Sequence, residues 1–191
     1  MDKKQLVTKA YDYAKEEIEK YGMPTKEHFE LSYQKAIWLG NKFNVDIDIS
    51  KIGVCLMDLK LGQAFKEGTL PNHIKMSADA SRMLIDKATI SKEDKEKIIN
   101  CIEAHHGTVE YKWMEAEICA NADCYRFIHP KGVFAAVVSF GKRFDNLQDV
   151  LKNTKLKMDE KKSIVSLDIV KEELEPYYKQ FSQLFEEVMK E

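Results

Sequence analysis

The spacing of apolar residues along the chain is helical almost throughout. Residues 3–21 place Leu6, Ala10 and Ala14 on one side of a highly charged segment, which is the pattern of an amphipathic helix. The same spacing predicts further helices at about 25–43, 73–84, 92–105, 112–127, 133–140, 147–151 and 164–188. No stretch shows sustained strand alternation and no repeat is found, so the pattern predicts an all-α fold.

One predicted helix differs from the others because it is apolar on almost every side. Residues 51–62, KIGVCLMDLKLG, carry Asp58 at their centre. A helix of this kind is normally buried, and a buried carboxylate needs a cation or hydrogen-bond donors. The segment that follows, GQAFKEGTLPNH at 62–73, lacks helical spacing and is predicted to be a loop.

Histidines and a second aspartate also lie in helical patterns. His105 shares an apolar stripe, and Asp123 falls on a face of small residues. His105, followed by His106 and Gly107, is hard to explain by packing alone, whereas three other residues have an ordinary structural explanation. His28 fits a half-buried packing histidine, His73 fits a loop residue, and Asp123 fits a buried carboxylate bonded to helix N-termini or to Arg126.

Composition narrows the class of protein. The chain has 191 residues, 44% hydrophobic and 32% charged, which suits a single domain over 1–191 with a substantial core. A net charge of -2 gives no reason to expect nucleic acid or an anionic membrane as a partner. The apolar runs are too short for a membrane span or a signal peptide, so we expect a cytoplasmic protein.

Cysteines and charge runs have plain interpretations. The four cysteines form no CxxC pair, so we expect buried, reduced thiols. The charge runs KEEIEK at 15–20 and KMDEKK at 157–162 are interpreted as solvated helix faces.

Several pieces of the chain, taken together, resemble the HD-domain metal-dependent phosphohydrolases. The pieces are HFELSYQKAIWLG with His28, CLMDLKLG with Asp58, NHIKMSADASRML with His73, IEAHHG with His105 and His106, and EAEICANADCYRF with Asp123. The resemblance covers about residues 25–128. It implies an HD-domain-like compact helical bundle, with a C-terminal helical extension at about 142–191 that could cover the site, support a homo-oligomer or finish the core.

The resemblance also implies a metal site. Its ligands would be His28, Asp58, His73, His105, His106 and Asp123, holding one or two divalent ions per chain (Mn, Fe, Co, Ni, Zn or Mg). Met57 departs from the pattern, because the family has a histidine there and a thioether is a weak ligand for such ions. A first ion would then rest on His28, Asp58 and Asp123, and a second on Asp58 with the remaining histidines.

The function implied is hydrolysis of a small-molecule phosphate ester, with a nucleotide as the expected substrate. Asp58 would orient the attacking hydroxide, His73 or a histidine of the 105–106 pair would protonate the leaving group, and Lys60 would reach a substrate phosphate or remain solvated. The loss of histidine at position 57 favours an alternative, a degenerate member that acts as a non-catalytic ligand-binding or regulatory module. A third interpretation is a helical scaffold whose charged C-terminal helix docks a partner.

Overall fold

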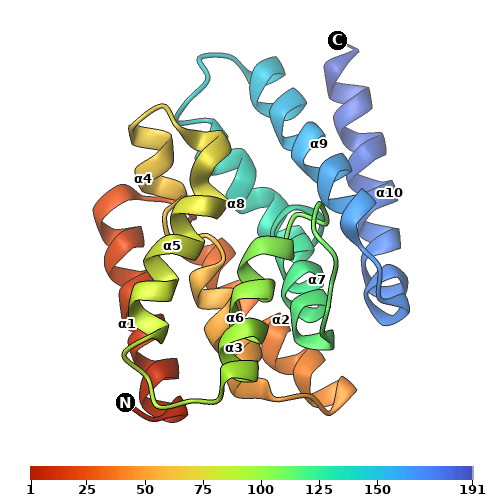
Figure 1. The fold of residues 1–191 in the computed structure, drawn as a ribbon. Coiled ribbons are helices and arrows are strands. Elements are labelled where there is room, and N and C mark those ends of the chain that lie inside the picture. The colour runs from red at the N-terminus through yellow and green to blue at the C-terminus, as the bar shows by residue number, and fades with distance from the viewer. Residues whose placement is uncertain (191) are drawn as a thin grey trace.

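The computed structural model describes residues 1–190, and its regular secondary structure is entirely helical, which confirms the predicted all-α class (Figure 1). The helices are α1 (Lys3–Tyr21), α2 (Lys26–Phe43), α3 (Ile47–Leu56), α4 (Leu61–Lys66), a 3-10 turn η1 (Leu70–Asn72), α5 (His73–Ile85), α6 (Lys92–Ala104), α7 (Met114–Ile128), α8 (Pro130–Phe140), α9 (Leu147–Ile164) and α10 (Asp168–Met189). Within the described residues, none of these helices is both long and apolar enough to cross a bilayer.

Helices α3 and α7 form the centre of the bundle. Helix α7 packs against α2, α3, α6, α8 and α9, and most of its residues are buried. Gly53 lets α3 approach α6 and α7 closely, because a Cβ added there would lie 2.6 Å from the Cβ of Cys101 and 2.9 Å from the Sγ of Cys119. All four cysteines are buried and free, as predicted.

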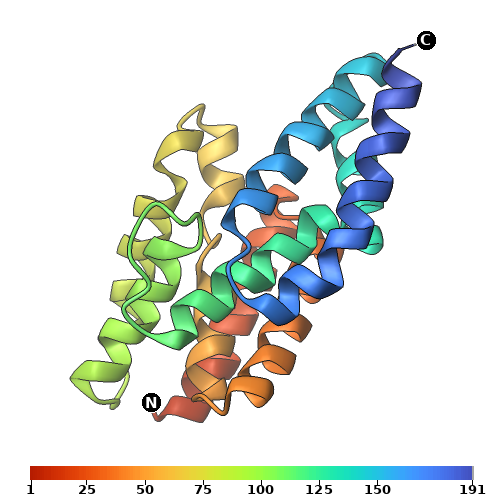
Figure 2. The same ribbon diagram turned by 90° about the vertical axis from the view of Figure 1, so that its right-hand side faces the viewer.

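The last two helices lie side by side along one edge of the molecule (Figure 2). Helix α9 packs on α7 and α8, and α10 packs on α9 and α7. The C-terminal helices therefore share the core of the bundle. They also bring residues of α9 next to the centre of α7.

The segment around Asp58 differs from the sequence-based expectation in two ways. Helix α3 begins at Ile47, capped by the side chain of Asp46, and ends at Leu56, so Asp58 lies in the turn after the helix and not at its centre. The predicted loop at 62–73 contains most of α4 and the turn η1. Six residues make fewer than two helical turns, too few for α4 to show a periodic pattern.

Candidate metal centre

Four side chains converge where the ends of three helices meet. Asp58 follows α3, His73 is the first residue of α5, and His105 and His106 follow the end of α6. One ligand atom from each lies within 4.8 Å of those of the other three. Residues that are far apart in the sequence therefore form one cluster of the kind that holds a metal ion.

Backbone hydrogen bonds orient two of the histidines. The Nδ1 of His73 lies 2.8 Å from the carbonyl oxygen of Leu70, and the Nδ1 of His105 lies 2.7 Å from that of Ile102. A carbonyl oxygen only accepts, so Nδ1 of each ring carries a proton, and in the neutral form of each ring the lone pair lies on Nε2. Metal-ligating histidines are commonly held in this way.

The free lone pairs face one carboxylate oxygen. The Nε2 atoms of His73 and His105 lie 3.5 and 3.4 Å from Oδ1 of Asp58. All three atoms are buried and lack a hydrogen-bond partner within the described residues. Facing acceptors without a proton between them are costly to bury, and a divalent cation would satisfy all three. The donor set thus fits a divalent ion.

His106 completes the cluster and also faces α9. Its Nδ1 lies 3.5 Å from Oε1 of Glu160. Burial lowers the pKa of His106, and the contact with His106 is the main cause that lowers the pKa of Glu160 to about 2. The carboxylate of Glu160 is therefore ionised and lies next to His106.

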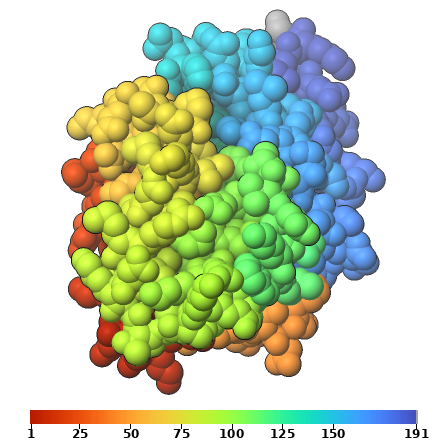
Figure 3. Space-filling view, in the orientation of Figure 1, coloured from red at the N-terminus to blue at the C-terminus, as the bar shows by residue number. Residues whose placement is uncertain are grey.

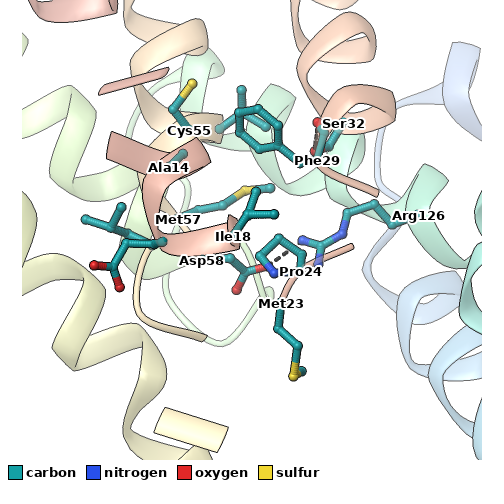
Figure 4. A pocket seen from close by; sticks show the side chains of 13 residues that line it. Ala14, Ile18, Met23, Pro24, Phe29, Ser32, Cys55, Met57, Asp58 and Arg126 are labelled. Carbon is teal, nitrogen blue, oxygen red and sulfur yellow. Dashed lines mark hydrogen bonds and ion pairs between the residues drawn. The ribbon is translucent and has the colours of Figure 1, made fainter. Parts of the chain in front are cut away.

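The other oxygen of Asp58 belongs to a buried ion-pair network. Figure 4 shows the Arg126 guanidinium directed at the Asp58 carboxylate, and Nη1 of Arg126 donates to Oδ2 of Asp58 and, at 2.6 Å, to Oδ1 of Asp123. The Nζ of Lys161 lies 2.6 Å from Oδ2 of Asp123. The structural explanation of Asp123, a pairing with Arg126, is thus present.

The network keeps both carboxylates ionised. Burial alone would raise the pKa of Asp58, but the guanidinium of Arg126 is the largest of the causes that hold it well below its usual range. Burial would likewise raise the pKa of Asp123, and Lys161 and Arg126 hold it low. The same carboxylates raise the pKa values of Arg126 and Lys161 against the effect of burial.

His28 lies outside the four-residue cluster, as does Asp123. The Nε2–H of His28 donates to the carbonyl oxygen of Gly132 at 2.9 Å, and its ring packs on Phe127. Burial, with Arg126 nearby, lowers the pKa of His28 to about 4, so the ring is neutral at physiological pH. These contacts match those of a packing histidine.

Lys60 is directed towards α1. Its Nζ lies 2.9 Å from Oε1 of Glu17 and over the ring of Tyr13. Glu17 is buried although it belongs to the charge run at 15–20, which was interpreted as solvated. The ammonium of Lys60 therefore has a carboxylate partner within the fold.

A cavity of about 570 Å³ adjoins the cluster, and Asp58, His73 and His106 contribute to its wall. On the face shown in Figure 3, the yellow residues of α4 and α5 lie beside the blue residues of α9, and all three helices contribute residues to the wall of the cavity. The rest of the wall is largely apolar, with Phe65, Leu70, Phe127, Phe140, Phe144 and Leu156, and its cations are Arg126, Arg143, Lys157 and Lys161.

Two cations of this wall were missed or misjudged from the sequence. Lys161 is 2% exposed, although its charge run at 157–162 was interpreted as solvated. A signal existed, because Thr154, Met158 and Lys161 share the buried stripe of α9. Arg143, whose guanidinium lies over the rings of Phe65 and Phe140, had no comparable signal.

Comparison with known proteins gives one informative similarity. The chain is 28% identical over 130 residues to Ribonuclease Y of Finegoldia magna, which covers 68% of this chain and 23% of that protein. The chain thus matches under a quarter of the length of this relative. No family model and no solved structure matches the chain.

Proposed function

We propose that the chain is a metal-dependent phosphohydrolase that cleaves a phosphomonoester or phosphodiester of a nucleotide or a related small phosphate ester. The observation that carries the proposal is the meeting of three unpartnered buried acceptors, from Asp58, His73 and His105, beside a cavity with cationic side chains. The similarity to a protein named as a ribonuclease, an enzyme that cleaves phosphodiesters, supports the same class of reaction.

A divalent ion held by Asp58, His73, His105 and His106 would supply an activated water and neutralise phosphate oxygens. The protein's own contribution is orientation. Asp58 is held at Oδ2 by Arg126, so that Oδ1 faces the histidines. The proton on Nδ1 of His73 is bonded to a backbone carbonyl. If the ion is held by Asp58, His73 and His105 alone, the unligated His106 is therefore favoured over His73 as the group that gives a proton to the leaving oxygen.

The cavity supports a substrate with both an anionic and a flat apolar part. Its volume of about 570 Å³ lies in the range of small-molecule sites. Arg143 and Lys157 would attract a phosphate, and the rings of Phe65, Phe140 and Phe144 would offer faces to a base. Within the described residues no carboxylate pairs with Arg143. Although burial lowers its pKa, the guanidinium keeps its charge at physiological pH, so that charge is available to an anion.

The test compares metal content and hydrolysis in matched histidine variants. The variant His105→Gln should lose its bound metal. Its rate of hydrolysis of p-nitrophenyl phosphate, of the corresponding diester or of a panel of nucleotides should fall at least about tenfold. His129→Asn is the control, because His129 caps α8 away from the cluster and asparagine can also cap a helix. Full metal content and full hydrolysis in His105→Gln would rule out this centre.

The alternative, a ligand-binding or regulatory module without catalysis, is favoured by Met57 and by the ion pair of Arg126 with Asp58. This alternative would be supported if calorimetry shows that the protein binds a nucleotide and no hydrolysis is detected with any of the divalent metal ions named above. A large gain of hydrolysis in Met57→His would show that the natural chain is an impaired enzyme.

A further inference from the structure

Two side-chain cations pair with the carboxylates of Asp58 and Asp123. Arg126 bridges the two carboxylates through Nη1, and Lys161 lies 2.6 Å from the remaining oxygen of Asp123. Three of the four carboxylate oxygens are therefore engaged by these cations. The fourth, Oδ1 of Asp58, faces the histidines.

The two other side chains that the resemblance assigned to this place are unsuited to a metal ion there. Met57 is 1% exposed and lies among apolar side chains such as Phe29 and Ile18 (Figure 4). Its thioether is a soft, weak ligand. His28 uses its Nε2–H on the backbone of Gly132. The donor set at this place does not fit a divalent ion.

Charge balance leads to the same conclusion. The two carboxylates are opposed by one guanidinium and one ammonium, and all four side chains are at most 10% exposed. A divalent ion added between the carboxylates would lie directly against Arg126, and the repulsion between like charges in a place largely shielded from water would oppose its binding. Arg126 and an ion would exclude each other.

We propose that Arg126, held by Asp123 and Lys161, replaces one of two ions, and that the chain binds a single divalent ion at the cluster of Asp58 and the three histidines. The count of one rests on the proposed metal centre. Arg126 is then a positioning residue that sets the orientation of Asp58. Because Lys161 pairs with Asp123, α9 belongs to the same ion-pair network. The guanidinium of Arg126 keeps its charge at all physiological pH values.

The test counts bound ions. The protein is loaded with Mn²⁺, freed of excess metal and measured by elemental analysis, and the wild type should hold about one ion per chain. The double variant Met57→His/Arg126→Gln should hold about two, with the magnetic coupling of adjacent Mn²⁺ ions in its electron paramagnetic resonance spectrum. The control Met57→His/Arg143→Gln removes a guanidinium elsewhere in the cavity and should stay at about one.

The outcomes separate this inference from the proposed function. Two ions in the wild type, or no added ion in a folded double variant, would overturn the inference and leave the histidine centre intact. An ion in the double variant but none in the wild type would support the role of Arg126 and refute the proposed centre, and no ion in either would refute both. If the double variant loses its helical circular dichroism, the wild-type count still decides.

Discussion

Replacement of Lys161 by methionine tests whether the buried network is stabilised as the structure indicates. The Nζ of Lys161 lies 2.6 Å from Asp123 in a side chain that is 3% exposed, and methionine preserves most of its length and packing. The change leaves Oδ2 of Asp123 buried without its partner. Removing one member of a buried ion pair costs about 3–5 kcal/mol.

Lys155 offers a matched control on the same helix. It pairs with Asp159 at 2.7 Å, but Asp159 is 42% exposed. An exposed pair of this kind contributes about 0–1 kcal/mol. Lys155→Met should therefore cost much less than Lys161→Met, although both remove one lysine from α9.

The assay is urea and thermal unfolding at neutral pH in the presence of a chelator, so that metal binding does not contribute. For a chain of this size about 1 kcal/mol shifts the melting temperature by about 2–4 °C, so Lys161→Met should lower it by roughly 6–20 °C. Equal losses in the two variants would refute the assignment of a strong buried pair.

The pH dependence gives an independent check. Although burial opposes it, Lys161 and Arg126 keep the pKa of Asp123 below its usual value. A lowered carboxyl pKa stabilises the fold above the unfolded value of about 3.9, and this stabilisation is lost as the pH falls through the folded value. The stability gap between wild type and Lys161→Met should be widest at neutral pH and shrink below about pH 4; a constant gap would contradict the pairing.

Three further predictions concern the cavity and the core. Arg143→Gln should raise KM for a phosphate ester about tenfold with little change in kcat, whereas Arg82→Gln, on an exposed helix face, should leave both unchanged in steady-state assays. Gly53→Ala should cost about 1–3 kcal/mol or more in urea unfolding, because the added Cβ meets Cys101 and Cys119 at less than 3 Å; unchanged stability would contradict this packing. The four buried thiols should resist a thiol reagent in the native protein and react fully in urea, and fast native labelling would show that they are accessible.

Helix boundaries with local signals could be predicted from the sequence. Thr25 caps α2 through its hydroxyl, and the first helix ends at Tyr21 before Gly22, as the pattern indicated. Boundaries without such signals could not. Helix α3 starts four residues before the predicted Lys51 because Asp46 caps it, and the turn that holds Asp58 separates it from α4.

The sequence by itself determined the all-α class and placed His105 and Asp123 on inward faces, because helical periodicity shows which side chains a helix buries. Tertiary structure alone decided what each carboxylate meets. Asp58 faces two histidines on one side and Arg126 on the other, and Asp123 meets a lysine of α9 from a segment interpreted as solvated. The reason is physical: a stripe on one helix shows that it packs, whereas the opposing charge comes from whichever distant helix the packing brings there.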